Sequence, residues 1–160
     1  MIRNTIRAAL AGLALLPILA LGTVSAAEPT TSLPPQAPPG TAVWARGTVH
    51  ESDGDSVRLN FHANNQAGVV NGNLNFQSED GSYNGGVRYF AVQGGVIYAT
   101  GAGPMTLPDG RRLRVNYSAT FGIESKRVSI HVSGADGYSY TVEGTLDGVV
   151  GTGRTLPAVQ

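Results

Sequence analysis

The sequence predicts an all-β domain, because hydrophobic and polar residues alternate with a period of two from about residue 42 to residue 152. Asp-Gly pairs, which favour tight hairpin turns, recur between the alternating segments. Connections this short join antiparallel neighbours. We therefore expect a single antiparallel meandering β-barrel of eight or nine short strands with essentially no helix. A two-sheet β-sandwich is the alternative.

The first three expected strands alternate in the way that buries one face. They cover about residues 42–50, 56–63 and 69–77. Asp53-Gly54 separates the first from the second, and Asn64-Asn65 begins the next turn. In the second strand Val57, Leu59 and Phe61 share one face, which we expect to lie in the core.

The remaining expected strands cover about residues 87–92, 96–101, 112–121, 127–133, 138–146 and 149–152. Gly-Gly and Asp-Gly pairs separate most of them, and Asp147-Gly148 is expected to form the last turn. Glycines inside strands, such as Gly47, Gly101 and Gly144, allow the sharp bends of a coiled sheet. They favour the barrel over the sandwich.

Residues 1–26 have the three parts of a cleaved secretory signal peptide. Arg3 and Arg7 form a positive start, an apolar run extends from Ala8 to about Leu21, and Ala26 supplies a small residue at the cleavage site. The run is shorter than the ~20 residues that cross a bilayer. We therefore expect no transmembrane anchor after cleavage near Ala26, and a secreted, periplasmic or cell-envelope location.

The expected domain, residues 42–154, is flanked by two segments with little apolar surface. Five prolines between Glu28 and Gly40 predict that residues 27–41 are a disordered, Pro-rich linker. Residues 155–160 are expected to form a flexible tail.

Composition excludes several classes of function. The formal net charge is zero, which argues against a nucleic-acid partner. The chain contains no Cys, which excludes disulfides, thiolate metal sites and a cysteine nucleophile. Only one Lys accompanies ten Arg, a bias typical of GC-rich bacterial genomes. No cofactor is predicted.

The polar faces of the strands supply the candidate ligand-binding residues. They are Arg58, Asn60, His62, Asn73, Asn75, Arg112, Arg114 and His131. An amide row on the third strand (Asn71, Asn73, Asn75 and Gln77) offers paired donors and acceptors for a sugar, or else is an ordinary solvated strand face. His62 and His131 would form a two-histidine site if their strands were neighbours; solvent-exposed histidines are the alternative.

Metal and catalytic signals are sparse. Glu51, Asp53 and Asp55 place three carboxylates around one turn and are candidate calcium ligands, although their order does not match a calcium-binding loop. The sequence contains no Gly-x-Ser-x-Gly elbow, no His-Glu-x-x-His and no phosphate-binding loop with Gly-Lys-Ser/Thr. The sequence therefore predicts no catalytic residue.

A resemblance rests on the spacing of glycines and strand residues. Gly72-x-Leu74-x-Phe76, Gly101-x-Gly103 and the alternation from Tyr138 to Gly148 form a pattern over about residues 45–152. This pattern resembles small exported bacterial all-β domains of unknown function. The resemblance implies the fold and export, and no catalytic residue.

Three functions fit these observations. The first is an exported soluble β-domain without catalytic machinery, which binds an unknown ligand or an envelope component. The second is a carrier of a small apolar ligand with a lipocalin-like cavity, which small interior residues such as Ala63, Ala99 and Ala119 would permit. The third is an enzyme using a barrel cavity, for which His62, His131 and Glu143 are the nameable residues.

Overall fold

Residues 32–154 are described by the computed structural model as eight antiparallel strands and one short 3-10 helix. The strands are β1 (Thr41–Glu51), β2 (Ser56–Gln66), β3 (Val69–Ser78), β4 (Gly81–Gln93), β5 (Val96–Thr106), β6 (Arg112–Gly122), β7 (Arg127–Gly134) and β8 (Ser139–Arg154). The 3-10 helix, Ala135–Gly137, joins β7 to β8. The expected signal peptide and C-terminal tail lie outside the described residues.

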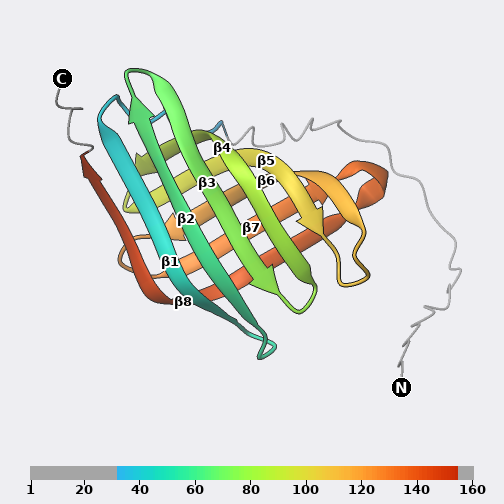
Figure 1. Cartoon of the computed structure of the whole chain (residues 1–160). Helices are drawn as coiled ribbons and strands as arrows, with labels where there is room; N and C mark the ends of the chain where they lie inside the picture. Colours follow the sequence, from blue (N-terminus) through green and yellow to red (C-terminus); the bar gives the residue numbers. More distant parts are fainter. Residues whose placement is uncertain (1–31, 155–160) are drawn as a thin grey trace, which may run out of the picture. The chain divides into compact units, whose positions relative to one another are not determined.

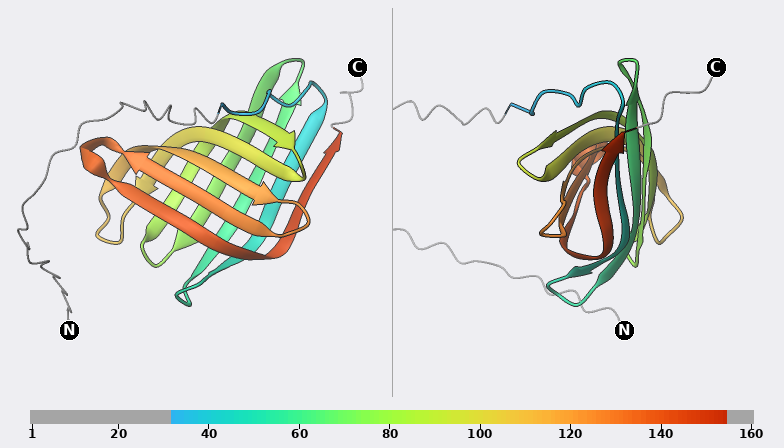
Figure 2. Two further views of the ribbon diagram at one scale, coloured as in Figure 1. Left: turned by 180° about the vertical axis from the view of Figure 1, so that it is seen from behind. Right: turned by 90° about the vertical axis from the view of Figure 1, so that its left-hand side faces the viewer.

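The strands form a closed meandering barrel, which confirms the predicted fold class and replaces the sandwich alternative (Figure 1). Each strand pairs with the next along the chain, and β8 returns to pair with β1, with Ala45 opposite Val150. Figure 2 shows β1–β3 and the first part of β4 as one layer and β5–β7 as a second layer, which crosses in front of the first in the left-hand view. Within the described residues, no helix is long and apolar enough to span a membrane.

The barrel turns between its layers at bends in β4 and β8. The first half of β8 pairs with β7 and the second half with β1, and the two pairings overlap at Gly144 and Thr145. A bulge between Val87 and Tyr89 interrupts the pairing of β4 with β5. These bends let one continuous sheet curl back on itself.

Several predicted strand boundaries are wrong. The segments 138–146 and 149–152 form the single strand β8, because Gly148 (φ 159°) lies opposite Gly47 (φ 154°) instead of forming a turn. A Cβ on Gly47 would lie 2.8 Å from the Cα of Gly148, so the close approach requires glycine. Strand β4 begins at Gly81 instead of residue 87, and β5 continues to Thr106.

Apolar side chains fill the interior, on the faces that the alternation predicts. Val57, Leu59 and Phe61 of β2 are at most 3% exposed. Phe61 stacks on Phe121 across the interior, with ring centroids 4.6 Å apart. Burial of this kind contributes roughly 1.5–3 kcal/mol per large side chain and is the main force holding the sheet closed.

A second aromatic group lies toward the end of the barrel that holds the β3–β4 turn. Phe76 stacks on Tyr83 at 5.3 Å and on Tyr140 at 6.0 Å. Tyr117 meets Tyr83 edge-on at 5.6 Å. Burial raises the pKa of the Tyr83 and Tyr117 hydroxyls. The Tyr140 hydroxyl donates a hydrogen bond to Ser78 Oγ at 3.0 Å.

The end of the segment predicted as a disordered linker packs against the barrel, which corrects that prediction for residues 32–40. Strands β3 and β4 pair only at their adjoining ends, with Asn73 opposite Gly86 as the last pair, and then separate. Ala37 is 4% exposed, and its N–H donates to the Phe90 carbonyl beyond that point at 2.9 Å. We call residues 32–40 the N-terminal strap.

Asn65, at the end of β2, holds the strap in place. Its side-chain Nδ2 donates to the Ala37 carbonyl at 2.7 Å, and its own carbonyl accepts from the Gly40 N–H at 2.7 Å. The Tyr89 hydroxyl donates to the Pro34 carbonyl. The strap thus gives a hydrogen-bond partner to the Phe90 carbonyl of β4, which lies beyond the point where β3 and β4 separate.

Candidate binding groove on the outer face

Strand register arranges polar residues in rows on the outer face of β2–β6. One row places Asn60, Asn75 and Asn84 opposite one another on three successive strands. The next row crosses five strands. It consists of Arg58, Gln77, Ser82, Thr106 and Arg112. Outward-facing residues on antiparallel neighbours come together in this way because their side chains share one face.

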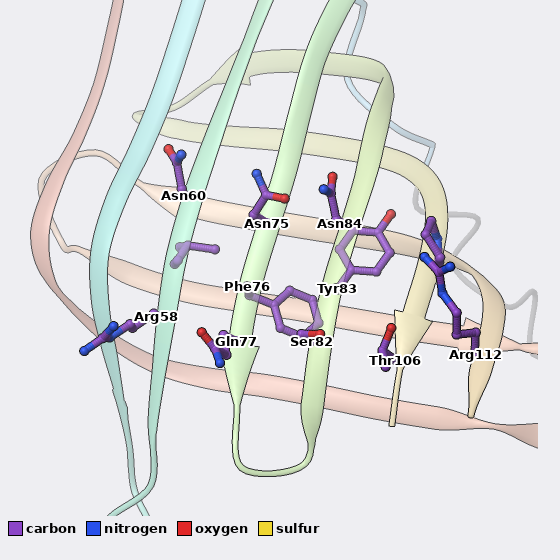
Figure 3. Close-up of a pocket in the computed structure, with 12 residues that line it drawn as sticks. Arg58, Asn60, Asn75, Phe76, Gln77, Ser82, Tyr83, Asn84, Thr106 and Arg112 are labelled. Atoms are coloured by element: carbon purple, nitrogen blue, oxygen red, sulfur yellow. The ribbon is translucent and has the colours of Figure 1, made fainter. Parts of the chain in front are cut away.

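These rows line a groove of about 400 Å³ (Figure 3). Asn60, Asn75 and Asn84 lie side by side in Figure 3, with Arg58 at one side of the groove and Arg112 at the other. Pro104 and Thr106 contribute from β5. The hairpin between β5 and β6 projects beyond the face of β1–β4, as the right-hand view of Figure 2 shows, and Thr106 and Arg112 at its base line the groove.

The groove carries positive charge without acidic neighbours in its lining. Arg58 and Arg112 are exposed, and no Asp or Glu is among the described residues that line the groove. Within residues 32–154 the one ion pair joins Arg111 to Asp109 at 2.6 Å, in the β5–β6 turn. Hydrogen bonds from the backbone N–H and side chain of Arg111 lower the pKa of Asp109. The guanidinium groups of Arg58 and Arg112 are thus available to an anion.

The amide groups are also available. Asn73 Nδ2 donates to Asn84 Oδ1 at 2.9 Å, which orients the Asn84 side chain beside the groove. In the described part of the chain, the side chains of Asn60, Asn75 and Gln77 make no hydrogen bond with the protein. Each presents a donor and an acceptor to a ligand.

A third row borders the groove and contains the chain's single tryptophan. Trp44, His62 and Asn73 lie opposite one another on β1, β2 and β3. The Trp44 ring lies over Gly151 and Gly153, where added Cβ atoms would come within 2.7 and 3.2 Å of it. It is 40% exposed. An amphipathic ring on the outer face is therefore accessible from solvent.

The structure brings some of the predicted site residues together. Arg58, Asn60, Asn75 and Arg112 line the groove. His62 and Asn73 lie in the bordering row, and Arg114 is opposite Pro104 on β6. Ser82 and Asn84 were not predicted, because the expected strands end at residue 77 and resume at residue 87 and so leave their segment unassigned. The alternation Ser82-Tyr83-Asn84, with the tyrosine inward, is the signal that identifies β4 there.

The two-histidine hypothesis is wrong for this barrel. His62 is on β2 and His131 on β7, which are not paired strands. His131 Nδ1 lies 3.1 Å from Thr141 Oγ1 on β8 instead. Glu143 accepts a hydrogen bond from Ser129 at 3.3 Å, also on the β7–β8 pair. The three residues considered for catalysis therefore do not converge.

The candidate calcium ligands do not converge either. Glu51 Oε1 accepts the Glu143 N–H at 3.1 Å, whereas Asp53 Oδ1 accepts the Asp55 N–H at 3.2 Å within the turn. Burial raises the pKa of Glu51, the backbone hydrogen bond from Glu143 opposes this, and the Asp53 and Asp55 charges raise it further. Among the described residues, no three acidic or histidine side chains are placed to hold a metal ion.

Comparison of the chain with protein-family models, with curated proteins and with solved structures finds no match.

Proposed function

We propose that the chain is an exported, non-catalytic binding module that recognises a hydroxyl-rich ligand, a saccharide, in the groove on the outer face of β2–β6. The observation that carries this proposal is the row Asn60–Asn75–Asn84, whose amides lie in register on three strands. Sugar hydroxyls both donate and accept hydrogen bonds, and a side-chain amide matches them with one group of each kind. The N-terminal sequence supports export, which would place the groove before extracellular or envelope polysaccharides.

The filled interior favours a binding site on the outer face. It disfavours the small-ligand carrier and the enzyme, since both need a cavity inside the barrel. Phe61, Leu74, Phe121 and Ile130 are fully buried, and the first and third of these stack face to face. A carrier or a cavity enzyme requires interior space of ligand size. The groove, by contrast, is open to solvent, and its lining includes the side chains of Asn60, Asn75 and Gln77, which make no hydrogen bond within the described residues.

The proposal is tested with a panel of purified neutral and uronate-containing polysaccharides, immobilised and probed with residues 27–160. Asn75→Ala/Asn84→Ala should bind at least tenfold more weakly than wild type. Asn71→Ala/Asn116→Ala is the matched control, because both side chains are exposed and neither lines the groove. No binding by wild type to any member of the panel, or equal loss in both variants, would refute the proposal.

A further inference from the structure

We propose that the ligand is an acidic polysaccharide, a chain of sugar rings carrying carboxylates, that lies across strands β2 to β6. This inference rests on the proposed function and adds the charge and direction of the ligand. It follows from the placement of the two arginines relative to the amide rows.

Positive charge stands at both ends of the groove. Arg58 and Arg112 stand at the two ends of one row, with the uncharged Gln77, Ser82 and Thr106 between them. Within residues 32–154, no acidic side chain lines the groove and neither arginine forms an ion pair. A guanidinium binds a carboxylate through two parallel hydrogen bonds. The groove is therefore complementary to an anion at each end.

The distance between the two arginines sets the length of ligand that can reach both. Arg58 and Arg112 are on β2 and β6, four strand spacings apart. At ~4.8 Å per spacing, the two Cα atoms are separated by roughly 19 Å along the sheet. One small anion does not reach both. A polymer with carboxylates on separate rings does, and its intervening hydroxyls meet the neutral residues of the row.

The polar rows set the direction in which an extended ligand lies. Both polar rows run across the strands, because register aligns residues perpendicular to the chain direction. Asn60, Asn75 and Asn84 form a second line parallel to the arginine row, so that a sugar ring between the two lines contacts both. Trp44, in the bordering row on β1, gives an extended ligand an aromatic surface beyond the groove.

A nucleic acid is the other polyanion to consider, and the composition disfavours it. Binding through phosphates takes several cations, and each neutralised phosphate adds to the affinity. The groove lining supplies two, in a chain whose formal net charge is zero. Interleaved amides with a charge at each end fit a polymer whose anionic groups are spaced among hydroxyls.

The test measures binding of residues 27–160 to polygalacturonate, a uronate polymer, and to dextran, a neutral glucan, by isothermal titration calorimetry. Arg58→Gln/Arg112→Gln should weaken binding to polygalacturonate at least tenfold. Arg127→Gln/Arg154→Gln is the matched control, because it removes the same charge from exposed positions on β7 and β8. It should change binding less than threefold. Added NaCl should weaken wild-type binding.

The outcomes separate this inference from the proposed function. Binding of dextran at least as tight as that of polygalacturonate, lost in Asn75→Ala/Asn84→Ala, would overturn the acidic ligand and support a neutral saccharide site. Equal weakening by the two arginine pairs would show attraction to net charge and overturn the assigned groove. Absence of binding to either polymer overturns the inference, and the wider polysaccharide panel then decides on the proposed function. A nucleic-acid oligomer competing at equal concentration would also overturn it.

Discussion

Replacing Asn65 by Ala should detach the N-terminal strap and destabilise the barrel. The Asn65 side chain is 2% exposed and makes two hydrogen bonds, to the Ala37 carbonyl at 2.7 Å and from the Gly68 N–H at 2.9 Å. Loss of the first leaves the carbonyl of a buried residue unpaired, at a cost of about 1–3 kcal/mol. Gly68 is exposed, so that its N–H turns to water at a cost of about 0.5–1 kcal/mol.

The expected loss is thus about 1.5–4 kcal/mol in the free energy of unfolding. Urea unfolding of residues 27–160, followed by the fluorescence of the single tryptophan, measures it. Asn71→Ala is the matched control, an exposed asparagine on β3, and should change the free energy of unfolding by less than about 0.5 kcal/mol.

A shortened chain that begins at Thr41 isolates the contribution of the strap. If Asn65 acts mainly through the Ala37 carbonyl, Asn65→Ala should cost only about 1 kcal/mol in the shortened chain, because the turn contact with Gly68 is then the one remaining. An equal cost of Asn65→Ala in the full-length and shortened chains would refute the reasoning, since it would mean that the strap is not coupled to this side chain.

Three further changes test the packing and charge of the barrel. Gly101→Ala should lower the free energy of unfolding by about 3 kcal/mol, because its Cβ would meet the Gly86 carbonyl oxygen of the paired strand; urea unfolding measures this. Tyr140→Phe should lower it by about 1 kcal/mol in the same assay, through loss of the hydrogen bond to Ser78. Burial and nearby carboxylates raise the pKa of Glu51 in the folded chain, which therefore binds the Glu51 proton more tightly than the unfolded chain does. Ionisation of Glu51 thus lowers the free energy of unfolding as the pH rises through the folded pKa. Glu51→Gln should therefore gain roughly 0.5 kcal/mol at pH 7 and nothing at pH 3, by urea unfolding at each pH.

Each of these changes has an outcome that contradicts its premise. A neutral Gly101→Ala would mean that β4 and β5 separate without cost at this point. An unchanged free energy of unfolding in Tyr140→Phe would mean that the hydrogen bond to Ser78 does not stabilise the barrel. A gain for Glu51→Gln that is as large at pH 3 as at pH 7 would exclude charge as its cause.

Local sequence patterns predicted the barrel because they report directly on which side chains face inward. Val57, Leu59 and Phe61 lie in the core as their alternation requires. Turn chemistry was less reliable, since Asp147-Gly148 resembles a hairpin turn but is accommodated within β8 by the glycine opposite it. The backbone freedom that makes glycine suitable for a turn also suits a bend inside a strand.

The groove and the strap depend on information that local patterns do not contain. Asn60, Asn75 and Asn84 lie side by side only because the lengths of two hairpins set their register, and no period in the sequence reports it. The strap has the composition of a disordered segment. Its one buried apolar residue, Ala37, lies where β3 and β4 separate, and hydrogen bonds with Asn65 and Phe90 hold it there.

Closure of the barrel through β1 and β8 affects how the chain folds during synthesis. Strand β1 can pair with β8 only after nearly the whole described chain has been made, since Thr41 pairs with Arg154. Contacts this distant in sequence slow folding. In a nascent chain with an incomplete barrel, one edge of β1 is unpaired, so chaperones that bind unfolded chains can still bind it. For a protein exported by the route we propose, delayed closure would keep the polypeptide threadable until its last strand has been translated.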